Sequence, residues 1–151
     1  MEELPAHGVT FLPPVLNPGK ILCVGLNYMK HLTEAAFARP TYPLFFARFA
    51  SGLGGHREPL VRPVCSVKLD FEGELVAVIG KPVRHASVHE ALGAVVGYSI
   101  FNDATIREYQ LDRGSQWTLG KNFDGTGGFG PFVVSANDLP TGGSGLAIKT
   151  V

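Results

Sequence analysis

Short apolar runs rich in β-branched and aromatic residues recur along this chain, separated by turns that contain Gly and Pro. Such runs are typical of β-strands. The runs that predict strands cover residues 20–25, 42–49, 67–80, 96–101 and 129–135. Helical patterns are fewer, and each is short: residues 29–38, a segment that starts at Ser87 with Glu90 in capping-box spacing, and residues 104–112. The sequence therefore predicts a mixed α+β fold that is mostly β, largely antiparallel and decorated with short helices, and not a wound α/β fold.

The two ends of the chain differ in character from its middle. Residues 1–18 are rich in Pro and predict an extended lead-in, so we expect the folded domain to span residues 19–151. The last residues, "GLAIKTV", resemble the first residues of a strand. A strand without a partner leaves an open sheet edge, so we expect an incomplete domain.

Composition narrows the class of protein. The chain has 151 residues, of which 45% are hydrophobic and 17% charged, which is enough for one domain with a core. Lys and Arg number 13, as do Asp and Glu, so no basic excess points to nucleic acid or to an anionic membrane. Neither cysteine belongs to a CxxC pair, and no apolar run is long enough to span a membrane. We expect a reduced, cytoplasmic protein that acts on small molecules.

Three acidic residues are candidate metal ligands. Glu72 and Glu74 occupy alternate positions of one predicted strand, so their side chains share a face about 6–7 Å apart. Asp103 follows the next apolar strand. Three carboxylates would form an oxygen-only site suited to Mg²⁺, Mn²⁺ or Ca²⁺. Spacing alone favours a solvated strand edge with Asp103 as a helix N-cap, because acidic pairs on strands are common.

Other motifs carry weaker signals. His31 and Glu34 are three residues apart on a predicted helix, so the pair could form an oriented general base or a surface ion pair of little energetic value. Lys121 could face a developing oxyanion or be an exposed lysine. The run "GTGGFG" at 125–130 matches a dinucleotide-binding pattern, but strand-like residues follow it instead of a helix, which favours a Gly-rich turn.

Five stretches, taken in order, carry a more specific signal: "GKILCVGLNYMKH", "YPLFFARF", "KLDFEGELVAVIG", "VVGYSIFNDATIRE" and "QWTLGKNFDGTGGFGP". Together they resemble the C-terminal domain of the fumarylacetoacetate hydrolase family. The resemblance begins near Gly19 and runs to the end of the chain. It implies a β-sandwich roll that binds Mg²⁺, Mn²⁺ or Ca²⁺ and acts on 2-oxo acids and β-dicarbonyl compounds, in a chain that lacks the later strands of the domain.

The resemblance also implies roles for individual residues. It places metal ligands at Glu72, Glu74 and Asp103, and substrate-binding residues at Arg107 and Gln110. Its catalytic positions fall on His31 and Glu34 of a lid helix and on Lys121, with Trp117 packed behind the site.

The function implied is a divalent-metal-dependent hydrolase or lyase that cleaves a C–C bond through an enolate, and a homodimer is expected. Two alternatives stay open. One is a non-catalytic partial module, and the other is a hydratase or isomerase of aromatic catabolism.

Overall fold

The structure is a computed structural model that describes residues 8–34, 38–114 and 116–151. It contains many short strands and a few short helices, as the sequence predicts. The strands are β1 Ile21–Gly25, β2 Leu44–Arg48, β3 Leu53–Gly54, β4 Leu69–Asp70, β5 Gly73–Ile79, β6 Val95–Asp103, β7 Thr105–Ile106, β8 Gly127–Phe129 and β9 Val134–Ser135. The α-helices are α1 Met29–Glu34, α2 Val88–Leu92 and α3 Trp117–Lys121. The other helical turns are η1 Ala50–Gly52, η2 Glu108–Asp112, η3 Ala136–Asp138 and η4 Thr141–Gly143.

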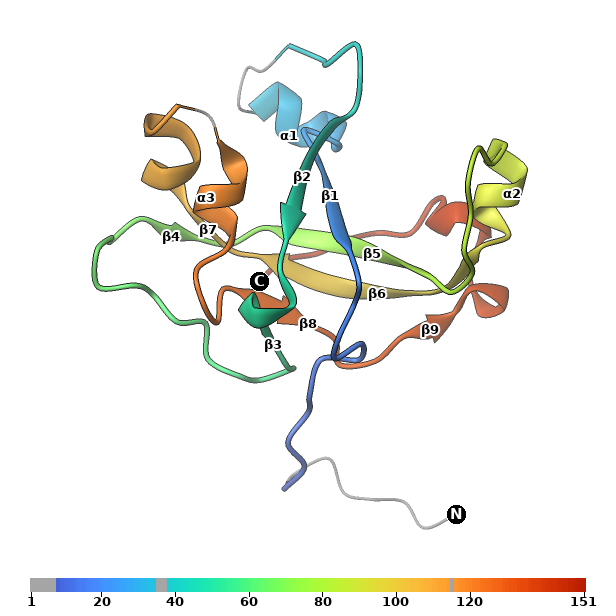
Figure 1. Cartoon of the computed structure of the whole chain (residues 1–151), viewed down its shortest axis with the longest axis horizontal. Helices are drawn as coiled ribbons and strands as arrows, with labels where there is room; N and C mark the ends of the chain where they lie inside the picture. Colours follow the sequence, from blue (N-terminus) through green and yellow to red (C-terminus); the bar gives the residue numbers. More distant parts are fainter. Residues whose placement is uncertain (1–7, 35–37, 115) are drawn as a thin grey trace.

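The central sheet is built around the long antiparallel pair β5 and β6 (Figure 1). Its strand order is β3-β8-β6-β5, and β9 also pairs with β6. Among the described strands, β3 and β8 form the one parallel pair. The mostly antiparallel β fold is therefore confirmed, and the Gly-rich run 125–130 contributes strand β8, not the strand–helix junction of a dinucleotide site.

A second layer is the antiparallel ribbon of β1 and β2, which crosses the central sheet and carries α1 in its connection (Figure 1). Side chains alternate along β2, so Phe46 and Arg48 share the buried face while Phe45 lies on the opposite face and is exposed. Leu44 lies on the same face as Phe46 but is exposed at the start of the strand. The prediction of a buried strand at 42–49 is thus right for one face of β2 only.

Local sequence signals predict where α1 and α2 begin, whereas in the predicted helical segment 104–112 tertiary strand pairing shapes the first residues. Ser87 and Glu90 form the predicted capping box at the start of α2. Helix α1 begins at Met29 as predicted and is described to Glu34, and residues 35–37 of the predicted helix lie outside the described residues. One or two helical turns were predicted in the segment 104–112. The structure contains one, the π-helical turn η2, and the residues before it form β7, which pairs with β4.

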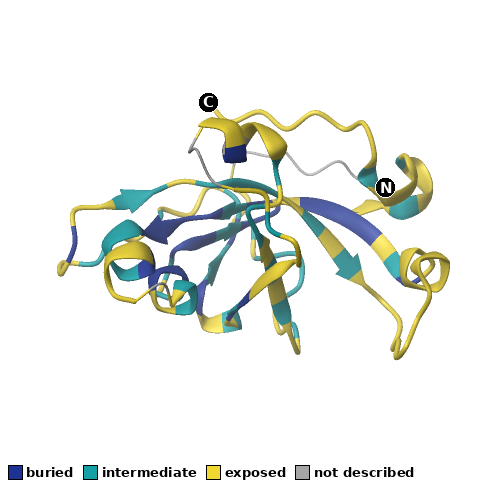
Figure 2. Cartoon of the chain, turned by 90° about the horizontal axis from the view of Figure 1, so that it is seen from above, coloured by how far each residue is buried: buried dark blue, intermediate teal, exposed yellow. Residues whose placement is uncertain are grey.

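The core lies between the two layers and along β6 (Figure 2). Phe101 of β6 meets Phe129 of β8 edge to face, with ring centroids 6.0 Å apart. The core also contains three charged side chains that are almost fully buried: Arg48, Asp103 and Lys121. Buried charges need partners, and theirs define the candidate site. No helix in the described part of the chain is long and apolar enough to cross a membrane.

Candidate active site

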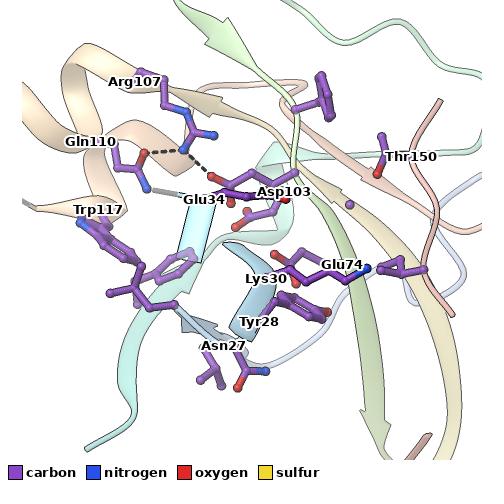
Figure 3. A pocket seen from close by; sticks show the side chains of 18 of the residues that line it. Asn27, Tyr28, Lys30, Glu34, Glu74, Asp103, Arg107, Gln110, Trp117 and Thr150 are labelled. Carbon is purple, nitrogen blue, oxygen red and sulfur yellow. Dashed lines mark hydrogen bonds and ion pairs between the residues drawn. The ribbon is translucent and has the colours of Figure 1, made fainter. Parts of the chain in front are cut away.

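A pocket of about 1020 Å³ opens beside α1 and the starts of β5 and α3. Its lining includes all three predicted metal ligands, Glu72, Glu74 and Asp103, together with Arg107 and Gln110. Figure 3 shows the labelled members of this set gathered around one cavity. The structure therefore brings together residues that are up to 38 positions apart in the sequence.

Sheet register places Glu72 next to Asp103. Glu72 immediately precedes β5, Asp103 ends β6, and the two strands pair with Gly73 opposite Asn102. The Asp103 N–H donates to the Glu72 carbonyl at 2.8 Å, and the Glu72 N–H donates to the Asn102 side-chain oxygen at 3.1 Å. Together with the strand register, these two hydrogen bonds hold Glu72 and Asp103 at the same end of the sheet.

Lys121 joins these two carboxylates. It ends α3 and its side chain is fully buried, so it is not an exposed lysine. Its Nζ donates to Glu72 Oε2 at 2.5 Å and to Asp103 Oδ2 at 2.7 Å. Gly120 allows α3 to approach η2, because a Cβ at this position would lie 2.7 Å from the backbone nitrogen of Gln110.

Arg48 neutralises Asp103 from the core side. Its guanidinium lies 2.5 Å from Asp103 Oδ1 and also donates to the Ala104 carbonyl at 3.2 Å and the Thr126 hydroxyl at 3.0 Å. Both oxygens of the Asp103 carboxylate thus contact a cationic group, which compensates for the removal of this carboxylate from water.

Arg107 holds Glu72 from the outer side. One of its nitrogens lies 2.5 Å from Glu72 Oε1 and donates to Gln110 Oε1 at 2.9 Å, and another lies 2.8 Å from Asp70 Oδ2. The two predicted substrate-binding residues, Arg107 and Gln110, are therefore in direct contact and line the pocket. The guanidinium is partly exposed, so it can also meet an anion in the cavity.

Glu74 differs from the other two carboxylates because it has no salt-bridge partner among the described residues. Burial raises its pKa to about 7 against the effect of a hydrogen bond from Tyr28, and the negative charges of Glu72 and Asp103 raise it further. The Tyr28 hydroxyl also accepts a hydrogen bond from the Leu75 N–H at 3.3 Å. A cation in the pocket would be the natural partner of this carboxylate.

The predicted base on the lid helix is only partly visible. Glu34 is exposed and lines the pocket, whereas the side chain of His31 lies outside the described part of the structure. The pairing of these two side chains therefore stays a prediction. Trp117 also lines the pocket and packs edge to face against Phe46, with ring centroids 5.7 Å apart.

The chemistry of the donors fits a hard divalent cation, because three carboxylates supply only oxygen ligands. Glu72 and Asp103 already share one cationic partner, the Lys121 ammonium. Within the described ranges, however, no three acidic, His or Cys side chains lie close enough together to hold one ion as they stand. Joint ligation by Glu72, Glu74 and Asp103 would thus require side-chain movement in the pocket.

Two residues of the site, Arg48 and Tyr28, were not predicted from the sequence. Arg48 is two residues after Phe46 on β2, so the two side chains share a face, and burial of Phe46 puts the guanidinium in the core as well. The two-residue spacing could therefore have predicted a buried arginine, and a buried arginine requires an acidic partner. Tyr28 sits in the short connection between β1 and α1, where the sequence pattern contains no comparable signal.

The fold and this pocket define a β-rich domain with a carboxylate-lined cavity, and sequence comparison assigns its family. The model of the fumarylacetoacetate (FAA) hydrolase C-terminal domain matches residues 20–151. The chain belongs to this family. The resemblance inferred from the five ordered motifs is thereby confirmed.

Similar proteins include enzymes with different names. The chain is 43% identical over 133 residues to a fumarylacetoacetate hydrolase domain-containing protein 2 homolog of Dictyostelium discoideum, covering 87% of this chain and 43% of that protein. It is 39% identical over 137 residues to the human mitochondrial oxaloacetate tautomerase FAHD2A, covering 90% of this chain and 44% of that protein. The chain thus spans less than half the length of these curated relatives.

Solved structures agree with this assignment. The fumarylacetoacetate hydrolase of Exiguobacterium antarcticum superposes with a TM-score of 0.75 at 36% identity, covering 85% of this chain and 47% of that one. A 5-carboxymethyl-2-hydroxymuconate delta-isomerase from Mycobacterium smegmatis also gives a TM-score of 0.75, at 31% identity, covering 87% of this chain and 52% of that one. The predicted fold of the family is confirmed, and its named members include hydrolases, isomerases and tautomerases.

Proposed function

We propose that this domain performs divalent-metal-dependent chemistry on 2-oxo acids or β-dicarbonyl compounds, cleaving a C–C bond through an enolate as a hydrolase or lyase. The observation that supports this most strongly is the gathering of Glu72, Glu74 and Asp103 on one pocket, with two of them joined by a buried lysine. Family membership adds support, because relatives are named as enzymes that act on small oxo acids and related compounds.

The residues have distinct roles in this proposal. Glu72, Glu74 and Asp103 would hold Mg²⁺, Mn²⁺ or Ca²⁺, which as a Lewis acid would stabilise negative charge on a substrate oxygen. Lys121 would supply a second positive charge at the same place. The Arg107 guanidinium and the Gln110 amide would bind the substrate carboxylate and orient it, because both border the cavity and can donate hydrogen bonds.

Helix α1 supplies the groups that act on water. His31 would accept a proton from a water molecule, and Glu34 would orient the imidazole and stabilise its charged form. Because Glu34 lies on the pocket lining, a small inward movement of α1 would place the pair over the substrate and exclude bulk water.

The same pocket suits a second candidate function, the interconversion of keto and enol forms or another isomerisation. The observation that favours it is that one relative is named an oxaloacetate tautomerase and a structural neighbour a delta-isomerase. Both reactions require an enolate and a proton donor but leave the carbon skeleton intact. The hydratase alternative differs from both because it adds water across a double bond.

A melting experiment tests the metal site. We expect Mg²⁺ or Mn²⁺ to raise the melting temperature of the whole chain, because a ligand that binds only the folded state stabilises it. Glu74→Ala should remove most of that rise. Asp124→Ala, at an exposed acidic residue away from the pocket lining, is the matched control and should retain the rise. Unchanged melting of the wild-type chain at saturating metal would contradict the proposal.

Product analysis separates the candidate reactions. Oxaloacetate and acylpyruvates are incubated with the chain and metal, and the products are followed by enol absorbance and mass spectrometry. Shorter carbon chains indicate cleavage, an altered enol signal with the mass unchanged indicates tautomerisation, and a gain of one water indicates hydration. Absence of any turnover despite metal binding would favour the non-catalytic alternative.

Three further expectations stay predictions. A homodimer can be checked by light scattering, and the absence of nucleic-acid and membrane partners by binding assays. The cytoplasmic location can be checked by fractionation, which is informative because the human relative is described as mitochondrial.

A further inference from the structure

The contacts of Lys121 point to a role beyond support of the substrate. Among the three cationic side chains that contact Glu72 or Asp103 in the described structure, only Lys121 contacts both carboxylates. Arg48 contacts Asp103 and Arg107 contacts Glu72. The ammonium therefore lies where an ion shared by the two carboxylates would also be drawn.

Its environment makes this contact strong. The Lys121 side chain is fully buried and the Asp103 side chain is 3% exposed, so water screens their attraction little. The Lys121 Nζ also donates to the Asp103 carbonyl at 3.2 Å, which gives the ammonium three oxygen partners. A buried ammonium has at most three hydrogens to donate, so its hydrogen-bonding capacity is filled by these two residues.

We propose that Lys121 is an internal counter-ion that competes with the divalent cation for Glu72 and Asp103. This inference rests on the proposed function in so far as a divalent cation binds these carboxylates. A doubly charged ion between them repels the ammonium and draws on the same oxygen lone pairs. Binding of the metal thus weakens the contacts of Lys121, and by linkage those contacts weaken binding of the metal.

The competition has two consequences for the site. Without metal, Lys121 neutralises the carboxylates of Glu72 and Asp103 and holds the ends of β5, β6 and α3 together. With metal, the ammonium loses at least one carboxylate partner and gains free hydrogens. These can then be donated to an oxygen of the substrate on which negative charge develops, so metal loading would prepare the lysine for its catalytic role.

The test is the affinity of the whole chain for Mn²⁺ alone, measured by isothermal titration calorimetry. Lys121→Met keeps a long side chain and removes the charge, so we expect Mn²⁺ to bind about tenfold tighter or more, since a unit charge within a few ångströms is removed from a poorly screened site. Lys68→Met is the matched control, because Lys68 also pairs with two carboxylates, those of Glu108 and Asp112, but on the exposed surface. Its affinity for Mn²⁺ should equal that of the wild type.

A second measurement uses the wild-type chain, in case the Lys121→Met variant does not fold. Reductive methylation followed by mass spectrometry reports the reactivity of each lysine with and without Mn²⁺. We expect Lys121 to react slowly without metal and several-fold faster with it, while Lys68 reacts equally in both.

The outcomes distinguish this inference from the proposed function. If Mn²⁺ binds the wild type and Lys121→Met with equal affinity, or binds the variant more weakly, the competition is refuted while the metal site stands. Unchanged reactivity of Lys121 on saturation with Mn²⁺ would refute it in the same way. If neither protein binds Mn²⁺, the proposed metal function fails and the inference fails with it.

Discussion

Asp103 and Glu74 lie on the two neighbouring central strands and line the same pocket, yet the fold treats their charges in opposite ways. Asp103 is buried and receives Arg48 and Lys121 on its two oxygens. Among the described residues Glu74 has no salt-bridge partner; Tyr28 donates a hydrogen bond to it, and burial raises its pKa to about 7. The charge of Asp103 is therefore neutralised by cationic side chains of the chain itself, whereas the charge of Glu74 would be neutralised by a bound cation.

Disturbing the buried Asp103 carboxylate should cost more stability than disturbing Glu74. Arg48→Met keeps most of the side-chain volume but leaves one oxygen of the buried Asp103 carboxylate without its cation. We expect a loss of about 3–5 kcal/mol in the free energy of unfolding, which is the cost of breaking a buried ion pair from one side. Urea denaturation followed by circular dichroism measures it.

Arg113→Met is the control for this variant. Arg113 is exposed and stacks on the ring of Tyr109 at 4.1 Å from its centroid, so its loss should cost about 1 kcal/mol or less. Equal losses of stability for the two variants would mean that the Arg48–Asp103 pair contributes no more than a surface contact. The contrast between Asp103 and Glu74 would then disappear.

The difference between Arg48 and the acidic residues also explains what the sequence could predict. Strand alternation put Glu72 and Glu74 on one face, and the end of an apolar strand indicated Asp103, because both are local properties of the chain. Arg48 follows the same alternation, but its meaning depends on Asp103, which is 55 residues away and is reached only through the packing of the ribbon on the central sheet. In the segment 104–112 the helical turn was predicted, but the strand before it was not, because the pairing of β7 with β4 is a tertiary contact.

Glu74 should make the stability of the metal-free protein depend on pH between about pH 4.5 and 7. Without metal, the native state keeps a proton on Glu74 up to about pH 7, whereas the unfolded chain releases it near the ordinary value of 4.5. Between these pH values the native state binds more protons, so the free energy of unfolding falls as pH rises from about 4.5 to 7 and is then constant for this group. Partial exposure of Glu74 screens the effect, which leaves about 1–2 kcal/mol.

Glu74→Gln sharpens this expectation. The neutral amide cannot lose a proton, so the variant should be more stable than the wild type at pH 8 and should show a flatter profile between pH 5 and 7 in metal-free urea titrations. Asp124→Asn, at an exposed position, should keep the wild-type slope. A variant profile as steep as that of the wild type would assign the pH dependence to another group.

The smallest effect belongs to Tyr28, which links α1 to the unpaired carboxylate. The Tyr28 carbonyl accepts the Leu32 N–H of α1 at 3.1 Å, while its hydroxyl accepts the Leu75 N–H of β5 and its hydrogen bond lowers the pKa of Glu74. Tyr28→Phe should cost about 1 kcal/mol, the usual net value of a hydrogen bond. It should also raise the pKa of Glu74 above its wild-type value, which carboxyl NMR titration of metal-free protein would detect.

Tyr42→Phe, at an 83% exposed ring, should change neither quantity. A Glu74 pKa that is unchanged in Tyr28→Phe would show that α1 and the carboxylate are not coupled through this phenol.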